Sequence, residues 1–223
     1  MAPIHEAIRA GDVEAVRREL AAGVSPDLRT AGLTQDLSSP PLVWTPLIVA
    51  IVNADSVQSE TELLEMVLLL IEAGADVDAV CAPHSHYTAI WFAVFSGSRK
   101  LVAALIAAGA STSLHVEGGS SHPPTRPVEL EFNSNELHII WQLLQAGSPL
   151  PRIDHTWWMQ PDADEFNSAA AGYVNAVAAA GGYVAYEKAH RAKLVAIFVP
   201  KLLRLPAEVI PTVIGFWAYT GHP

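Results

Sequence analysis

The residues with the clearest capacity for chemistry are one cysteine and two histidines that lie close together in the sequence. Cys81, His84 and His86 form a C-x2-H-x-H cluster, and thiolate and imidazole groups are ligands that zinc prefers. A structural zinc site takes four such ligands at recognised spacings, and no second Cys/His pair accompanies this cluster. The sequence therefore predicts a polar turn at these residues and no bound metal.

Local motifs for catalysis are missing from the sequence. It contains no G-x-S-x-G nucleophile turn, no G-x-x-x-x-G-K-[ST] phosphate loop and no H-E-x-x-H pair. No motif thus brings together a nucleophile, a base and oxyanion donors, and we expect neither an enzyme nor a cofactor. A catalytic site built from residues of distant loops is the one enzymatic alternative that the sequence leaves open.

The distribution of charge narrows the class of partner. The 223-residue chain has a formal net charge of −10, and residues 1–160 carry all of it, with 8 Lys/Arg against 18 Asp/Glu. An acidic surface repels phosphate backbones, so nucleic acid is not the expected partner. We expect another protein with a basic or neutral surface, and the chain as a possible subunit of a larger assembly.

Cysteine content and hydropathy bear on the compartment. Cys81 is the only cysteine, which excludes a disulfide within the chain and favours a reducing, intracellular compartment such as the cytoplasm. The first residues lack the cationic segment and apolar core of a signal peptide. Charged residues and three prolines interrupt the longest apolar stretch, Leu194–Tyr219, so we expect no membrane span.

An internal repeat is the strongest structural signal in the sequence. Three helical patterns each pass through a small alanine and end in Ala-Gly, at Ile4–Gly23, Thr45–Gly74 and Thr88–Gly109. The distance from this alanine to the glycine is 16 residues in the first and third segments and 24 in the second. An eight-residue insertion near Ala54–Thr61 accounts for the difference. One unit of two helices therefore recurs along the chain.

The residue types at fixed positions of the unit explain its helices. Thr45 and Thr88 stand where a hydroxyl group can cap a helix, and Pro46 fits the first helical position. Small residues at Ala50 and Ala93 let paired helices approach closely. The final glycine suits a position of positive φ after the second helix. An apolar stripe on that helix is expected to be buried, at Leu20, Leu69, Leu70, Leu105 and Ile106.

These segments resemble the ankyrin repeat, a unit of about 33 residues with the signature T-P-L-H-x-A. A fourth, degenerate unit ends at Gly147 and has Arg126–Glu131 in the signature position, with Ile140, Leu143 and Leu144 in the apolar stripe. Glu131 replaces the small alanine there, as atypical terminal repeats allow. The resemblance implies an all-α ankyrin-repeat solenoid of about four repeats within residues 1–154, near 4–30, 44–81, 87–116 and 126–154.

Two long connections depart from the family pattern. Leu33–Val43 and Glu117–Pro124 are rich in serine, proline and glycine and are predicted to be loops. Insertions of a solenoid lie on one face, which is often the binding face.

The resemblance also implies a protein-binding surface made by turn tips and by the exposed ends of the first helices. Its positions in this chain are His84, Trp44 and Tyr87 at the tips, and Arg9, Val52, Asn53, Phe95, Ser96, Asn133 and Ser134 on the helices. Large aromatic side chains dominate interface energies, so Trp44, Tyr87 and Phe95 stand out. The alternative for Trp44 and Tyr87 is packing beneath the long loops. Trp91, where the family has histidine, is expected to pack between repeats.

Residues 155–223 form a separate, C-terminal segment. Helices are predicted at Asp164–Ala180, Tyr183–Val199 and Pro206–Tyr219, and their apolar faces favour a helical cap over the open end of the solenoid. Leu194, Ile197 and Phe198 are expected on buried faces.

An alternative function rests on the end of this segment. Its sequence Leu-Pro-Ala-Glu-Val-Ile from Leu205 resembles the opening of the F-box-like helix that follows ankyrin repeats in poxvirus proteins. That resemblance implies a substrate receptor of a cullin ubiquitin ligase, which docks through Leu205, Pro206, Val209 and Ile210.

Overall fold

The computed structural model describes residues 3–31, 43–53, 59–81, 87–114, 126–130, 137–151 and 166–198, which form helices in almost all of their regular structure. The elements, in chain order, are α1 Pro3–Arg9, α2 Val13–Ala21, β1 Thr30–Ala31, β2 Val43–Trp44, α3 Pro46–Val52, α4 Glu60–Glu72, α5 Ala89–Phe95, α6 Arg99–Ala107, α7 Pro127–Leu130, α8 Leu137–Gln145, α9 Phe166–Ala179 and α10 Tyr183–Phe198. The predicted all-α, ankyrin-like fold is confirmed.

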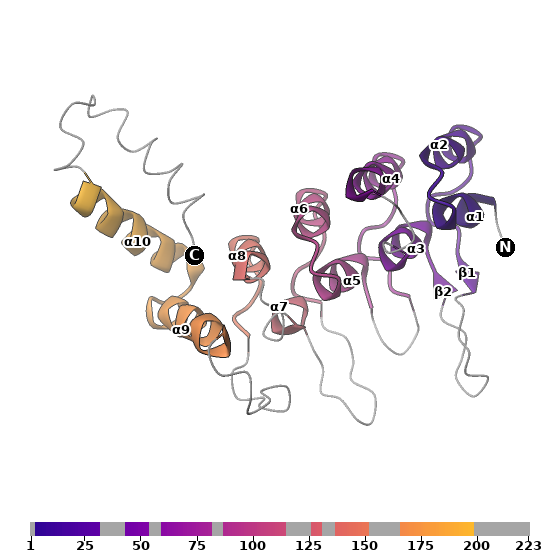
Figure 1. Ribbon diagram of the computed structural model, residues 1–223. Coiled ribbons are helices and arrows are strands. Elements are labelled where there is room, and N and C mark those ends of the chain that lie inside the picture. Colours follow the sequence, from indigo (N-terminus) through magenta and orange to yellow (C-terminus); the bar gives the residue numbers. More distant parts are fainter. Residues whose placement is uncertain are drawn as a thin grey trace, which may run out of the picture.

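Helices α1 to α8 stack in two layers. The first helix of each pair contacts the first helix of the next, so that α1, α3, α5 and α7 form an inner row. The second helices α2, α4, α6 and α8 form an outer row beside it (Figure 1). Each pair thus buries one face against its own partner and another against its neighbours, as a solenoid requires.

Of the two predicted threonine caps the structure confirms one, and it adds an aspartate cap that was not predicted. The Thr45 hydroxyl oxygen accepts a hydrogen bond from the Ile48 amide at 3.4 Å, which caps α3. Asp12 caps α2 in the same way. Thr88 was expected to cap α5, but its side chain makes no capping hydrogen bond and is buried, 1% exposed. Thr45 is equally buried, at 1% exposure, so burial alone does not account for the missing hydrogen bond of Thr88.

Glycine ends the outer helices as predicted. Gly74 and Gly109 have φ values of 88° and 89°, and the amide of the next residue donates back to the helix, from Ala75 to Leu70 O and from Ala110 to Leu105 O. This backbone geometry satisfies carbonyl groups that the helix end would leave unpaired.

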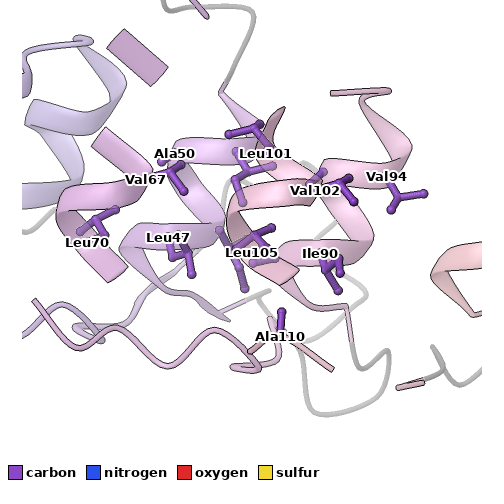
Figure 2. Close-up of a cluster of buried hydrophobic side chains, with 14 of the residues drawn as sticks. Leu47, Ala50, Val67, Leu70, Ile90, Val94, Leu101, Val102, Leu105 and Ala110 are labelled. Atoms are coloured by element: carbon purple, nitrogen blue, oxygen red, sulfur yellow. The ribbon is translucent and has the colours of Figure 1, made fainter. Parts of the chain in front are cut away.

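A continuous hydrophobic core lies between the two rows of helices (Figure 2). Leu47 and Ile90 from the inner row meet Leu70 and Leu105 from the outer row, and all four side chains are fully buried. The small Ala50 and Ala93 are also fully buried, in agreement with the close helix approach expected of them. Fully burying such aliphatic side chains contributes roughly 1.5–3 kcal/mol each.

The predicted stripe of the outer helices is buried only in part. Leu70 and Leu105 lie in the core, whereas Leu20, Leu69 and Ile106 are half-buried at its edge. In the fourth pair the expected Ile140, Leu143 and Leu144 are all buried.

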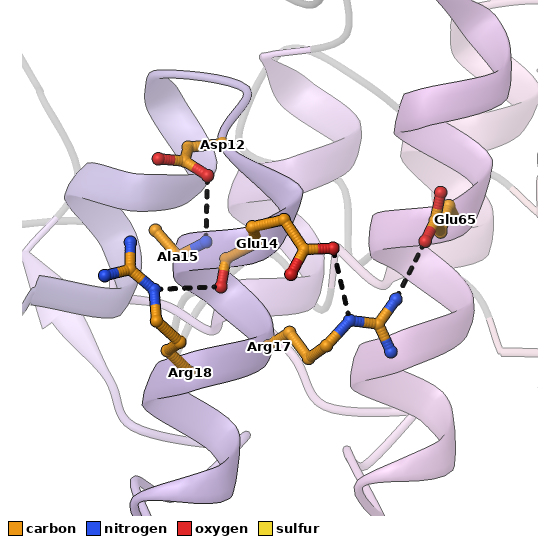
Figure 3. Close-up of polar contacts among 6 residues, drawn as sticks. All are labelled: Asp12, Glu14, Ala15, Arg17, Arg18 and Glu65. Carbon is orange, nitrogen blue, oxygen red and sulfur yellow. Dashed lines mark hydrogen bonds and ion pairs between the residues drawn. The ribbon is translucent and has the colours of Figure 1, made fainter.

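Exposed ion pairs join neighbouring outer helices. The Arg17 guanidinium donates to Glu65 at 2.9 Å and lies 3.5 Å from Glu14, which connects α2 to α4 (Figure 3). Lys100 on α6 pairs with Glu60 on α4 at 2.6 Å. Each such exposed pair contributes at most about 1 kcal/mol, so the apolar core dominates stability.

Two features of the second pair differ from the prediction. Two-residue strands β1 and β2 pair antiparallel, with Thr30 opposite Trp44, where only loop was expected. Helix α4 has 13 residues against 9 in α2 and α6, so part of the eight-residue insertion extends this helix at its N-terminus. Ser59 caps it.

The C-terminal helices α9 and α10 continue beyond α8. Val174 and Val177 of α9 are buried, and α10 contacts both α9 and α8. The expected burial of Ile197 on α10 is wrong, because this side chain is 43% exposed, while Leu194 is half-buried. The predicted helix Pro206–Tyr219 and the side chain of Phe198 lie outside the described residues. No helix in the described ranges is long and apolar enough to cross a membrane.

Candidate functional site

The segments that precede the inner helices are joined by backbone hydrogen bonds. The Val43 amide donates to the Cys81 carbonyl at 2.7 Å, and the Cys81 amide donates to the Tyr87 carbonyl at 2.9 Å. These bonds align the approaches to α3 and α5 and fix the positions of Trp44 and Tyr87 relative to each other. Trp44 and Tyr87 are both half-buried and pack against the core, whereas the long loops of the packing alternative lie almost wholly outside the described residues.

An aromatic cluster surrounds α5. The Trp91 ring lies 4.5 Å from Tyr87 and 5.3 Å from Phe92, measured between ring centroids. Phe95, one turn further along the helix, stacks almost parallel on Trp91, with a centroid distance of 5.5 Å and an interplanar angle of 7°. Trp91 thus lies between the half-buried rings of Tyr87 and Phe92 and the exposed ring of Phe95.

Phe95 is the most exposed aromatic residue among those whose burial the structure describes. Its side chain is 72% exposed, although it belongs to a helix whose other apolar residues are buried or half-buried. Stacking on Trp91 holds the ring in place, so its exposure is not a consequence of a loose side chain. A fixed, solvent-facing aromatic ring is the kind of group that anchors protein interfaces.

Polar side chains at the ends of the neighbouring inner helices are already hydrogen-bonded to the backbone. Asn53, after α3, donates from Nδ2 to the Val49 carbonyl at 2.8 Å, and Ser96, after α5, donates to the Ala93 carbonyl at 3.0 Å. The Val49 and Ala93 carbonyl groups accept these bonds in addition to backbone bonds from the Asn53 and Ser98 amides. Asn53 and Ser96 therefore shape the surface beside Phe95 more than they offer free donors to it.

The remaining predicted contact residues fall into two groups. Arg9 on α1 and Val52 on α3 are half-buried, and Val52 packs against the core. His84, Asn133 and Ser134 lie outside the described residues, as do Leu205, Pro206, Val209 and Ile210 of the F-box-like resemblance.

A set of residues that the sequence analysis missed fixes one repeat to the next. Asp27, the fourth residue after Gly23, accepts a hydrogen bond through Oδ1 from the amide of Asp76, the second residue after Gly74, at 2.9 Å. Asp78 accepts in the same way from the Ser111 amide at 2.8 Å. The sequence contained a signal for these hydrogen bonds, because the residues that form them recur at fixed distances after the glycine that ends each unit.

This series of hydrogen bonds changes at the junction with the fourth helix pair. Ser113 occupies the position of the accepting aspartates, and Pro149 occupies the donor position but has no N–H. Instead, the Ser148 hydroxyl donates to the Thr112 carbonyl at 3.4 Å. A longer, neutral hydrogen bond thus replaces the charge-assisted one.

The reactive groups near this surface are shielded. Cys81 is buried, and desolvation raises the pKa of its thiol to about 11, so the thiol is protonated at neutral pH. Within the described ranges no three metal-ligating side chains lie together. His84 and His86 of the C-x2-H-x-H cluster are outside those ranges.

Comparison with known proteins identifies one unit of the array directly. The family model described as "Ankyrin repeat" matches residues 44–82, which contain α3 and α4. A search of curated proteins finds no match to the chain. Ankyrin repeats are modules that bind other proteins, and their surfaces are rarely catalytic. Residues 44–82 therefore match an ankyrin repeat, and the helix pairs stacked on either side of them give the chain an all-α, ankyrin-like fold, which is typical of modules for protein–protein interaction.

Proposed function

We propose that this protein is a scaffold or adaptor that binds its partner along the ends of the inner helices, with Phe95 at the centre of the contact. The observation that carries the proposal is the 72% exposure of a phenylalanine ring that is stacked in a fixed position on Trp91. Fully covering such a ring contributes roughly 1.5–3 kcal/mol to binding. Little conformational entropy is lost, because the ring is already held in place.

The residues around Phe95 support a binding surface of limited polarity. Ser96 and Asn53 have side-chain groups already bonded to the backbone, so a partner that covers them leaves few polar groups without hydrogen bonds. Val52 and Arg9 extend the same row of helix ends on α3 and α1. Trp44 and Tyr87, which pack against the core, belong to the proposed contact set, and His84, Asn133 and Ser134 complete it.

Charge indicates what kind of protein surface would fit. Residues 1–160 carry 18 acidic against 8 basic side chains, so a partner with basic or neutral residues is favoured electrostatically. A cationic side chain placed over the face of Phe95 would gain a further contribution of about 0.5–1 kcal/mol at an exposed site.

Affinity purification with quantitative mass spectrometry tests the proposal. The wild-type chain is compared with Phe95→Ala and with a matched control, Leu28→Ala, which truncates an exposed apolar residue at 38% exposure on another part of the array. We expect partners whose recovery falls severalfold with Phe95→Ala and is unchanged with Leu28→Ala. Equal recovery with all three chains contradicts the proposed surface.

The same experiment separates the two alternative functions. A ligase receptor predicts recovery of cullin components that depends on Leu205, Pro206, Val209 and Ile210 and is insensitive to Phe95→Ala. An enzyme with a loop-built site predicts no stable partner. None of the described residues favours either alternative, so the binding role through Phe95 is the function that we propose.

A further inference from the structure

The described part of the chain leaves most of helix α10 uncovered, at the far end of the array (Figure 1). The rings of Tyr186 and of Tyr173 on α9, whose centroids lie 5.5 Å apart, mark the face of α10 toward α9. Even here no described side chain of α10 is buried, and the half-buried ones are Tyr183, Tyr186, Glu187, His190 and Leu194. Ten other residues of the helix are exposed, and seven of these ten are apolar.

A stripe of alanines runs along the uncovered side of α10. Its four members are all exposed and follow one another at i, i+4, i+7 and i+11, on one face of the helix: Ala185, Ala189, Ala192 and Ala196. Val195 and Ile197, at 37% and 43% exposure, flank the C-terminal end of this alanine stripe. Such small side chains let another segment approach the helix backbone closely.

The first helix pair presents a different surface to solvent. Three of the four exposed residues of α2 are charged, Glu14, Arg17 and Arg18. The terminal unit of a solenoid needs a polar outer face of this kind, because no further unit covers it. The apolar side of α10 does not provide one, so this side is suited to contact with another segment.

The residues that follow α10 in the chain have the composition of such a covering segment. Among residues 205–219 only Glu208 is charged. The apolar residues of this segment include several large ones, at Leu205, Val209, Ile210, Val213, Phe216 and Trp217. Large side chains of this kind fill the space above small alanines.

The lengths allow this contact within one chain. Six residues, 199–204, separate α10 from the segment, within the roughly 2–8 residues usual between neighbouring helices. The alanine stripe covers about 16 Å of α10, and fifteen residues in a helix cover about 22 Å. Pro211 would kink such a helix, but packing on the stripe does not require a straight one. A short tether gives the segment an effective concentration on the order of millimolar, which favours it over a free partner.

Charge favours the same arrangement. Lys188 and Lys193 border the alanine stripe on its two sides, and neither forms an ion pair within the described ranges, whereas Arg191 pairs with Glu187. A segment that returns antiparallel along α10 brings Glu208 to the C-terminal half of the helix, close to Lys193. The one carboxylate of the segment thus meets a cation that has no other ion-pair partner.

We propose that residues 205–219 fold back over α10 and pack on its alanine stripe within the same molecule. The contact covers apolar surface at the end of the array. It also covers Val209 and Ile210, so these side chains are not free to dock on another protein. The contact does not depend on the proposed partner surface at Phe95, which belongs to α5.

Paramagnetic relaxation enhancement in the full-length chain locates the segment. A nitroxide is attached at Val184→Cys, beside the N-terminal end of the stripe, and in a control chain at Ala103→Cys, an exposed position on α6. The native Cys81 is buried and stays unlabelled. We expect the amide signals of Phe216 and Trp217 to broaden with the label at position 184 and not with the label at 103. Absence of broadening from position 184 overturns the proposal.

A mixed sample distinguishes a contact within one molecule from a contact between copies. Isotope-labelled chains without nitroxide are combined with unlabelled chains that carry it at position 184, and we expect no broadening of Phe216 or Trp217. Broadening in this mixture overturns the proposal, because a second copy then covers α10.

Hydrogen–deuterium exchange tests whether the alanine stripe makes the contact. Ala189→Glu places a charge in the stripe and should speed amide exchange in residues 205–219 about tenfold or more. Ala103→Glu makes the same change at an exposed alanine of α6 and should leave that exchange unchanged. Exchange in α4 and α6 checks that the array stays folded in both variants. Unprotected amides at 205–219 in the wild type overturn the proposal, and so does equal exchange in the wild type and Ala189→Glu.

Discussion

The carboxylate of Asp78 accepts a hydrogen bond from the backbone amide of Ser111, 33 residues further along the chain, at 2.8 Å. Asp27 and Asp76 stand in the same relationship one unit earlier. A charged acceptor on a backbone amide is stronger than a neutral one, and the Ser111 amide is partly buried. These two contacts thus fix the register of successive helix pairs where the outer helices end.

Replacement of Asp78 by alanine should lower the free energy of unfolding by about 1 kcal/mol, because it leaves the Ser111 amide without its acceptor. Urea denaturation followed by circular dichroism measures this change. Asp78→Asn keeps a side-chain oxygen and is expected to lose less than half as much. If Asp78→Ala is as stable as the wild type, the contact does not contribute to stacking.

Gly74 provides a test of backbone conformation alone. Its φ of 88° is unfavourable for residues with a side chain, yet a Cβ atom there would meet nothing within 4 Å. Gly74→Ala should therefore cost about 1 kcal/mol through backbone strain. Gly74→Asn should cost less, because asparagine tolerates this region better than alanine. Equal thermal stability of the alanine variant and the wild type contradicts the assignment of a positive φ to Gly74.

His5 is expected to make the free energy of unfolding depend on pH. Both ring nitrogens of His5 are buried, and burial lowers the pKa of its side chain below 6.5. The Arg9 charge acts in the same direction, and backbone groups of Trp44 and Leu28 oppose it. The folded state thus holds neutral His5, whereas the unfolded state takes up a proton once the pH falls below about 6.5. The contribution of neutral His5 to the free energy of unfolding is therefore present above that pH and is lost as the pH falls.

His5→Leu removes this titration. We expect the variant to be at least as stable as the wild type at pH 7.5, and to gain relative to it as the pH decreases from 6.5 to 5. Urea denaturation of both chains at each pH measures the difference, which cancels the titration of the other histidines. A difference that stays constant over this range shows that His5 does not titrate abnormally.

The contribution of helices α9 and α10 to the stability of the chain can be tested by placing aspartate at a buried and at an exposed valine. Val177 on α9 is fully buried and Val184 on α10 is 78% exposed. Val177→Asp should destabilise the chain by about 3 kcal/mol or more, because it buries a charge among apolar side chains. Val184→Asp should change stability by less than about 0.5 kcal/mol. Similar melting temperatures for the two variants would show that α9 does not cap the array.

The sequence predicted those features that depend on short-range chemistry. Glycine at Gly74 and Gly109 and the threonine cap at Thr45 each act on the residues next to them, so their types are sufficient to place helix ends. Thr88 shows the limit, since the same residue type in the same position makes no capping hydrogen bond.

Features that depend on distant residues were not predictable in this way. The pairing of Thr30 with Trp44 joins residues on either side of a long connection, and the contact of Asp78 with Ser111 joins neighbouring units. Phe95 was included in the candidate surface by its position in the repeat. Its exposure and its stacking on Trp91 follow only from the arrangement of side chains around α5.

Photocrosslinking from position 95 tests the proposed binding surface most directly. The photoreactive analogue p-benzoylphenylalanine replaces Phe95 in one chain and Leu28 in a control chain, and both are expressed and irradiated in cells. The account predicts a discrete crosslinked partner from position 95 that is absent from position 28. Adducts from position 28 alone, or the same adducts from both positions, would contradict the claim that the partner covers Phe95.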